Sequence, residues 1–248
     1  MTSNLRLSTS APSPHPWNGT GVRSRFFDAL SLLLPGGEQF LIETLESWRA
    51  SAQLGPGDEL GGEIDRFIRE EQAHRRAHAN YNAALVDAVP HMQPLVERAN
   101  AITADLAGFS APMKLALVVA FEHLTAVLAE EIEAHPFLLV RNDSRAARLW
   151  RWHAREELGH RHVAVCVANR AGIGRGALTL ALLLATLYLA TDLLRYTFAL
   201  CRCDVRAGAS RATLIADSVR FAGGAIPSLL RMARHWFGLL LSPTRCAR

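Results

Sequence analysis

The chain has 248 residues, 50% of them hydrophobic and 20% charged, which is enough for one sizeable domain. Alanine and leucine are abundant and β-branched runs are few, so the composition predicts an all-α protein. The net charge of +4 is almost entirely arginine. The arginines alternate with acids and no aromatic-plus-basic motif accompanies them, so we expect no nucleic-acid partner.

The predicted elements are helices that follow an N-terminal tail. Residues 1–21 are rich in serine and proline, lack the apolar segment of a secretory signal, and are predicted to be disordered. Because the four cysteines form no disulfide framework either, we expect a cytoplasmic protein. Apolar periodicity and Pro or Gly breaks, the first at Pro35-Gly36-Gly37, then predict helices over residues 22–34, 38–52, 58–89, 95–107, 110–135 and 145–169.

Two apolar segments follow in the C-terminal part of the chain. Residues 177–191 carry no charge, and an extension to residue 200 would reach the length of a membrane span but include two charges. A buried core helix, an interfacial helix and a marginal span therefore remain open. Residues 210–241 are predicted to form an amphipathic helix, broken near Gly223-Gly224 and Pro227, that lies on a membrane surface or packs on the bundle. We accordingly predict a bundle domain at 22–170 and appended helices at 171–248.

The pattern Glu-x-x-His occurs twice on predicted helices. The first copy is Glu71 and His74, and the second is Glu157 and His160. At this spacing both side chains of a copy lie on one face of the helix. A single copy is as well explained by a solvated helix face, since arginines adjoin both. Two copies on long helices favour metal ligation instead.

Each motif is preceded by a helix with a further candidate carboxylate. Glu38 and Glu122 lie 33 and 35 residues before the glutamates of the two motifs, so the chain consists of two similar helix pairs. The alternative for Glu38 is a helix cap after the glycines, whereas Glu122 in its apolar helix needs a partner. One Glu and one Glu-x-x-His per helix pair is the arrangement of ferritin-like di-metal proteins. We therefore predict a ferritin-like four-helix bundle with extra C-terminal hydrophobic and amphipathic helices.

Two further histidines lie one helical turn from the motifs. His78 follows His74 and His153 precedes Glu157, so each is a candidate ligand or acid–base catalyst beside the metals. Oxygen-rich ligands with several imidazoles suit iron best, with manganese or zinc as alternatives, and we expect two divalent ions. The predicted ligands are Glu38, Glu71, His74, His78, Glu122, His153, Glu157 and His160.

Four segments combine these residues with characteristic neighbours: Pro35-Gly36-Gly37-Glu38-x-Phe40, Glu71-x-x-His74-x-x-x-His78-x-x-x-Asn82, Phe121-Glu122-His123-x-Thr125-Ala126 and Trp152-His153-x-x-Glu156-Glu157-x-x-His160. Over residues 26–200 they make the chain similar to the bacterial family of predicted metal-dependent hydrolases, a ferritin-like helical group. One departure is Gly159, where that family usually has another acid before the histidine. The resemblance implies a di-metal enzyme of unsettled substrate.

Three functions follow from these residues. The first is a di-iron enzyme that activates O₂ to oxidise or oxygenate a small apolar substrate. The second is metal-assisted hydrolysis, in which two Lewis-acidic ions deprotonate a bridging water and His78 or His153 shuttles the proton. The third is a membrane-associated metal-binding or ferroxidase-like protein without an organic substrate. We expect a small-molecule substrate in the first two cases and leave a peripheral contact with the inner membrane and a homodimer open.

Overall fold

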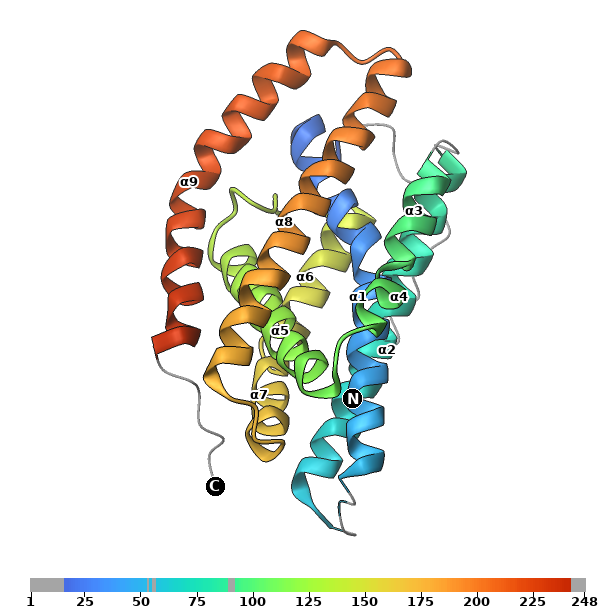
Figure 1. The fold of residues 1–248 in the computed structure, drawn as a ribbon. Helices are drawn as coiled ribbons and strands as arrows, with labels where there is room; N and C mark the ends of the chain where they lie inside the picture. Colours follow the sequence, from blue (N-terminus) through green and yellow to red (C-terminus); the bar gives the residue numbers. More distant parts are fainter. Residues whose placement is uncertain (1–15, 53, 55–56, 89–91, 242–248) are drawn as a thin grey trace.

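The computed structural model describes residues 16–52, 54, 57–88 and 92–241. Most of the predicted disordered tail therefore lies outside the described residues, but residues 16–21 are placed, and Asn18 is fully buried against the Leu138 carbonyl, to which its side-chain amide donates at 2.9 Å. The described residues contain helices and no strand, which confirms the all-α prediction. The helices are α1 (Gly21–Ser51), α2 (Glu59–Ala88), α3 (Gln93–Asn100), α4 (Ile102–Ala107), α5 (Ala111–Ala134), α6 (Arg145–Glu157), α7 (His160–Arg170), α8 (Arg175–Arg206) and α9 (Arg211–Leu241) (Figure 1).

The first two predicted helices are one helix, because Pro35-Gly36-Gly37 does not interrupt α1. A proline inside a helix lacks the N–H that would reach the carbonyl four residues earlier. That carbonyl belongs to Ser31 and accepts a hydrogen bond from the Asn82 side chain of α2 instead, at 2.8 Å. The Ser31 carbonyl, which lacks its usual partner within α1, is thus hydrogen-bonded by a residue of α2, and α1 continues through Pro35.

Gly36 is needed where α1 meets the α3–α4 connection. A Cβ at this position would lie 2.7 Å from the Ala99 carbonyl oxygen and 2.8 Å from the Ile102 side chain. The Gly36 carbonyl also accepts a hydrogen bond from Thr103 at 2.9 Å. The glycine that resembled a helix break is therefore a point of close helix approach.

Three other predicted boundaries were wrong. The predicted helix at 145–169 is divided at Leu158–Gly159 into α6 and α7, and the one at 95–107 is divided at Ala101 into α3 and α4. The predicted break in 210–241 does not occur, since α9 runs through Pro227. Glycine has a low helix propensity, which is consistent with the division at Gly159.

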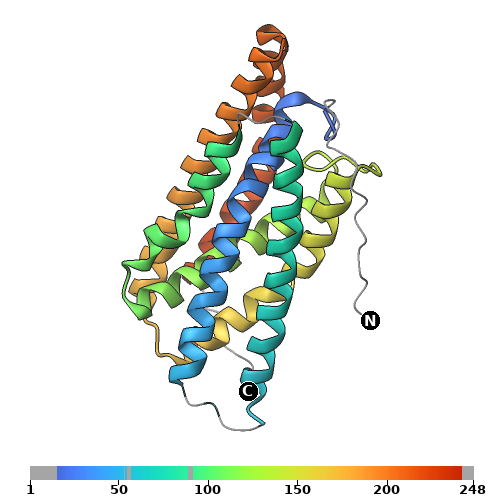
Figure 2. The same cartoon turned by 90° about the vertical axis from the view of Figure 1, so that its right-hand side faces the viewer.

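The helices that carry the predicted ligands pack together. α1 runs beside α2, α5 packs on α6 and α7, and α2 meets α6 and α7 across the bundle (Figure 2). Apolar side chains close the space on both sides of the ligands: Phe67 lies against His160, with ring centroids 4.9 Å apart, and Trp150 lies against His78 at the same separation. The ligands therefore lie inside the packed region.

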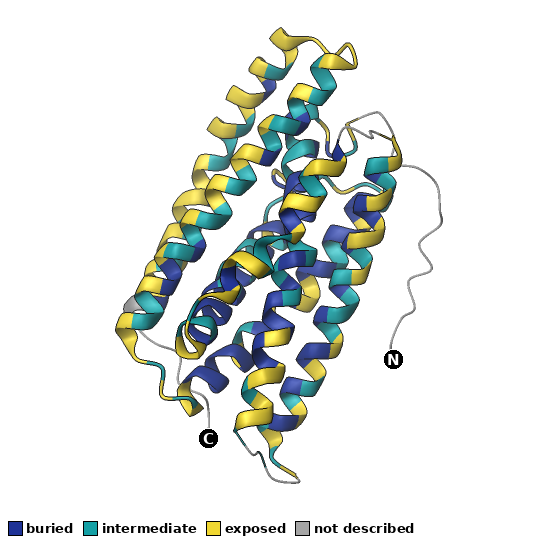
Figure 3. Cartoon of the chain, turned by 45° about the vertical axis from the view of Figure 1, so that its right-hand side comes forward, coloured by how far each residue is buried: buried dark blue, intermediate teal, exposed yellow. Residues whose placement is uncertain are grey.

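The C-terminal helices lie on the outside of this arrangement. α8 packs on α1 and α5 through a buried stripe that includes Ala181, Leu182 and Ala185, and α9 runs antiparallel to it along the edge of the molecule (Figures 1 and 3). α8 is long and apolar enough to cross a membrane by length and composition, and an 18-residue window within it has a mean hydropathy of 1.9. The division of the chain at residue 170 stays a prediction.

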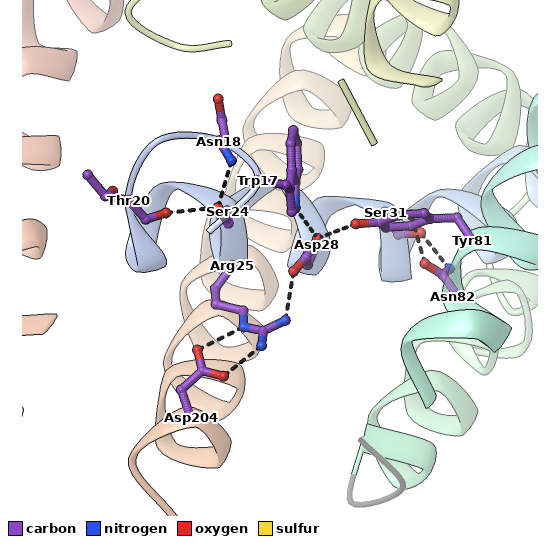
Figure 4. A network of polar contacts seen from close by, with 10 residues as sticks. All are labelled: Trp17, Asn18, Thr20, Ser24, Arg25, Asp28, Ser31, Tyr81, Asn82 and Asp204. Atoms are coloured by element: carbon purple, nitrogen blue, oxygen red, sulfur yellow. Dashed lines mark hydrogen bonds and ion pairs between the residues drawn. The ribbon is translucent and has the colours of Figure 1, made fainter. Parts of the chain in front are cut away.

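A polar network joins the start of α1 to α2 and α8 (Figure 4). The buried Asp28 carboxylate accepts hydrogen bonds from Trp17 at 3.0 Å, Tyr81 at 2.7 Å and Arg25 at 2.9 Å. Arg25 also makes a two-pronged ion pair with Asp204 of α8, at 2.8 and 2.6 Å. Charge-assisted hydrogen bonds of this kind fix the relative position of the three helices.

Candidate metal centre

The eight predicted ligands come from five helices and lie in one buried region. Each has no more than 3% of its surface exposed. Ionisable side chains are rarely buried to this extent without a partner. They are Glu38 of α1, Glu71, His74 and His78 of α2, Glu122 of α5, His153 and Glu157 of α6, and His160 of α7.

The first subset is formed by the two Glu-x-x-His motifs. One ligand atom from each of its four residues lies within 4.8 Å of all the others. His160 Nδ1 is 2.7 Å from Glu71 Oε1, and His74 Nδ1 is 3.3 Å from the same oxygen. Glu157 Oε1 lies 3.6 Å from His74 Nδ1. The two motifs therefore face each other across the bundle, although Glu157 and His160 stand on separate helices.

The second subset is Glu38, His74 and His153, whose ligand atoms also lie within 4.8 Å of one another. The His74 and His153 rings are 4.5 Å apart between centroids. His153 Nε2 lies 3.1 Å from Glu157 Oε1, so the two subsets are contiguous. His74 belongs to both subsets, and both of its ring nitrogens are buried without a hydrogen-bond partner among the described residues.

Glu122 and His78 belong to neither subset, but each directs an unpartnered atom into the same region. Glu122 Oε2 and His78 Nε2 are buried without a hydrogen bond. The pKa of Glu122 is raised well above its ordinary value by burial and by the charges of Glu157 and Glu71. The assignment of Glu122 and His78 as ligands stays a prediction.

The chemistry of the donor set fits divalent cations. Both Glu38 oxygens, Glu71 Oε1, both His74 nitrogens and the Nδ1 atoms of His153 and His160 are buried without a hydrogen-bond partner among the described residues. Glu71 Oε1 and His160 Nδ1 are close, yet the geometry between them is not that of a hydrogen bond. Leaving so many buried polar atoms unpaired is costly. Cations bound between them would satisfy these atoms.

The protonation of the metal-free cluster reflects the crowding of its carboxylates. Burial raises the pKa of Glu38 well above its ordinary value, and the charges of Glu71, Glu157 and Glu122 raise it further. Burial also acts to raise the pKa of Glu157, but the hydrogen bond and charge of His153 outweigh it and lower that pKa to about 2. Burial would lower the pKa of His160, but the Glu71 carboxylate 2.7 Å away and the charges of Glu122 and Glu157 raise it to about 10.

Comparison with known proteins agrees with this geometry. The family model described as a predicted metal-dependent hydrolase matches residues 3–241. The chain belongs to this family. No curated protein and no solved structure matches the chain. The family resemblance inferred from the motifs is confirmed, and the buried Glu and His cluster is consistent with the metal dependence in the family's description.

For a predicted metal-dependent hydrolase, the surroundings of His78 are informative. Ser31 donates its hydroxyl proton to Asn82 Oδ1 at 2.7 Å, and Asn82 is oriented by its own bond to the Ser31 carbonyl. Having given its proton to Asn82, the Ser31 hydroxyl accepts one from His78 Nδ1, 2.8 Å away. His78 Nε2 is therefore the unprotonated nitrogen, and it is the atom left free for a cation.

Two other residues orient the ligands from outside. Thr125 of α5 donates to Glu157 Oε2 at 2.9 Å, and Glu70 Oε2 accepts from His160 Nε2 at 3.1 Å. The bond to Glu70 occupies Nε2 of His160 and leaves Nδ1 as the atom that could bind a cation, as a carboxylate behind a metal-binding histidine commonly does.

Sequence reasoning did not single out Ser31. A usable signal for Ser31 was available: it lies seven residues, or two turns, before Glu38 in an otherwise apolar stretch of α1.

A pocket of about 340 Å³ leads from the surface to one edge of the cluster. It lies at the turn between α6 and α7 and contains His160, Glu70, Gly159 and two arginines, Arg66 and Arg155. The other described pocket of comparable size, about 390 Å³, contains none of the eight predicted ligands. This pocket gives solvent and small molecules access to His160, at the edge of the candidate metal centre.

Proposed function

We propose that this protein is a metal-dependent hydrolase with two divalent cations held by the eight buried Glu and His side chains. The observation that carries the proposal is the convergence of unpartnered carboxylate oxygens and imidazole nitrogens from five helices into one buried region. The family description supports metal-dependent hydrolysis over oxidation.

The proposal includes a ferritin-like bundle. One helix of each pair supplies a single glutamate, Glu38 or Glu122, and its partner region supplies a Glu-x-x-His motif. This is the ligand plan of di-metal carboxylate proteins. The chain departs from that plan in one respect, since its second motif is divided between α6 and α7. The division places His160 beside the pocket.

We assign different roles in hydrolysis to the bound cations and to the residues at the α6–α7 turn. Bound cations would supply Lewis acidity, which polarises a substrate oxygen and acidifies a water molecule. Arg66 and Arg155 line the pocket and provide positive charge for an anionic group of a small substrate. Glu70, whose side chain is 33% exposed, contacts His160 at 3.1 Å and connects the ligands to solvent for proton exchange.

The surroundings of His78 favour ligation over the acid–base role predicted for His78 and His153. Burial lowers the pKa of His78 well below its ordinary value, with the charges of His153 and His74 acting in the same direction. A histidine with no route to solvent and a lowered pKa is better suited to ligation than to proton transfer. We therefore place proton exchange at His160 and Glu70, and treat His78 and His153 as ligands.

A second candidate is O₂ activation by two iron ions. The observation that favours it is the burial of Glu38, His74 and His78 beneath apolar side chains, which would exclude water from an oxidant. Oxygen-rich ligands with imidazoles also suit iron.

The deciding experiment compares the two reactions on protein with a measured metal content. Zinc-, manganese- and iron-loaded protein is assayed anaerobically with p-nitrophenyl esters of carboxylic and phosphoric acids, and oxygen uptake is recorded for the reduced iron form. Hydrolysis without O₂ that disappears with a chelator supports the hydrolase. Oxygen consumption by the iron form, with no hydrolysis by any form, would replace it with the second candidate.

A matched pair of variants on α5 tests the ligand set. Glu122→Gln is expected to reduce the bound metal by about one ion per chain or weaken its binding about tenfold or more. Glu130→Gln, on the same helix and 38% exposed at its side chain, is expected to retain the full metal content. Equal metal content in the two variants would show that Glu122 is not a ligand.

A further inference from the structure

The outer surface of α8 and α9 is apolar over the length of both helices. On α8, Leu187 is 61% exposed and Leu194 is 69% exposed, and on α9, Val219 is 69% exposed and Leu230 is 64% exposed. Contiguous exposed apolar surface of this kind marks an interaction site. We call this surface the outer face, and it consists of Leu180, Leu183, Leu187, Leu194, Phe198, Ile215, Val219, Ile226, Leu229, Leu230 and Phe237.

α9 is amphipathic in the reverse sense of an ordinary surface helix. Its buried polar residues, Asp217 and Ser228, face the protein, and Arg231 makes two hydrogen bonds of 2.8 Å to Glu131 of α5. Most of its large aliphatic side chains, Ile215, Val219, Ile226, Leu229 and Leu230, are exposed, whereas Leu239 near its end is buried. In a soluble surface helix the apolar side packs on the core and the polar side is solvated. The orientation of α9 is therefore consistent with an apolar surface outside the protein.

The exposed charges that border the outer face are all positive. Asp192 is partly buried, Asp204 is paired with Arg25, and Asp217 is buried. Three arginines, at 202, 206 and 211, gather where the two helices turn. The exposed Asp, Glu, Lys and Arg residues of α8 and α9 are Arg175, Arg195, Arg202, Arg206, Arg211, Arg220 and Arg234.

We propose that the outer face docks on the surface of a lipid bilayer with anionic headgroups, with α8 and α9 lying in the interface. An interfacial helix buries its apolar side beneath the headgroups and keeps basic residues at their level. Each arginine near an anionic leaflet adds about 1 kcal/mol of attraction. The apolar residues and the bordering arginines of this surface meet both requirements.

The other occupants of the outer face fit less well. Pairing with a second copy would bring the bordering arginines of both chains together, and like charges repel. The terminal segments of the chain, residues 1–15 and 242–248, contain too few large apolar residues to cover eleven apolar side chains. A membrane-spanning α8 would have to leave α1 and α5 and break the ion pair between Arg25 and Asp204.

The test is flotation of the full-length, metal-loaded protein with vesicles of phosphatidylglycerol and phosphatidylcholine, compared with phosphatidylcholine alone. We expect flotation with the anionic vesicles. The double variant Leu187→Ser/Leu230→Ser should partition about tenfold more weakly or worse. Leu158→Ser removes a 49% exposed leucine from the α6–α7 turn and should float like the unmodified protein. The triple variant Arg202→Gln/Arg206→Gln/Arg211→Gln should lose the preference for anionic vesicles.

The outcomes separate this inference from the alternatives and from the proposed function. Absence of flotation, or undiminished flotation of the leucine variant, would overturn the inference. A concentration-dependent dimer that the leucine variant abolishes, without flotation, would assign the outer face to a second copy. Circular dichroism and metal content of each variant confirm that the fold is retained. The inference does not depend on hydrolysis, because it concerns residues outside the metal centre.

Discussion

The two ring nitrogens of His78 have different surroundings. Nδ1 is held by Ser31, which is itself held by Asn82, while Nε2 is buried without a partner. Because Ser31 has a single proton and gives it to Asn82, the tautomer of His78 is set by these two residues. Residues that hold a metal ligand in place from outside matter for metal affinity, and replacing one commonly costs about tenfold or more.

Replacing Ser31 with alanine should therefore weaken metal binding. Without the hydroxyl, His78 Nδ1 and Asn82 Oδ1 lose their partner, and the imidazole is free to rotate or change tautomer. We expect a loss of about tenfold in affinity, measured by competition with a chromophoric chelator. Ser51→Ala, at the exposed end of the same helix, serves as the control. An unchanged affinity in Ser31→Ala would show that His78 is not a ligand.

Metal binding should release protons and strengthen as the pH rises. Burial raises the pKa of both Glu38 and Glu122, so these carboxyls hold their protons to a higher pH than ordinary glutamates. The pKa of His160 is raised to about 10 by its carboxylate partners despite burial, so this imidazole carries a proton near neutral pH. A cation must displace those protons, so affinity is lower at about pH 6 than at about pH 8. Titration calorimetry in buffers of different ionisation enthalpy measures the release. Proton uptake, or affinity independent of pH, contradicts the expected protonation.

At the scale of single helices, the Pro35-Gly36-Gly37 sequence shows how a break signal can instead serve packing. Pro35 frees the Ser31 carbonyl for Asn82, and Gly36 admits the Ala99 carbonyl at close range. The same three residues thus connect α1 to α2 and to the α3–α4 turn. A helix-breaking composition is overridden when neighbouring helices satisfy the groups that it leaves unpaired.

The two adjacent glycines of α1 provide a matched test of this packing. Gly36→Ala would place a Cβ against the Ala99 carbonyl, which has no flexible side chain to move aside. We expect the free energy of unfolding to fall by about 1–3 kcal/mol. Gly37→Ala meets nothing within 4 Å and should be neutral or raise it by up to about 1 kcal/mol. Urea denaturation of both variants measures the difference, and equal stabilities would contradict the close approach of α1 to α3 and α4.

At the scale of the whole molecule, burial of the carboxylates of the candidate metal centre lowers the stability of the metal-free fold. Four carboxylates are buried in one region, and the raised pKa of Glu38 and of Glu122, caused first by burial, shows that the metal-free protein resists holding them ionised. Bound cations would remove this penalty and link all the ligand-bearing helices. Folding and metal binding are therefore coupled.

Removal of metal should lower the melting temperature. At a thousandfold excess of free metal over its dissociation constant, binding stabilises the fold by about 4 kcal/mol. For a chain of this size that corresponds to roughly 10 °C in Tm. Calorimetric scans with and without chelator measure the shift. In Glu122→Gln, the difference in Tm with and without chelator should be smaller, because the variant binds metal less well and buries one carboxylate fewer. A Tm that is the same with and without chelator would contradict the expectation that metal bound at the cluster stabilises the fold.

The residues of the metal centre were predictable because their signal is periodic. Glu71, His74 and His78 repeat at helical spacing, and a second motif at a similar distance from its own upstream glutamate made chance an insufficient explanation. Burial of all eight predicted residues in one region agrees with that pattern. The all-α class was predictable for the same reason, since long uninterrupted apolar periodicity specifies helices.

What the sequence by itself determined is which residues share a helical face, because spacing along one helix is a local property. Which groups on different helices meet was decided only by the tertiary structure. That applies to the continuity of α1 through Pro35, to the bond from Asn82 that supports it, and to the outward direction of the apolar side of α9. A proline signals the same break whether or not a second helix lies beside it, so only packing shows the difference.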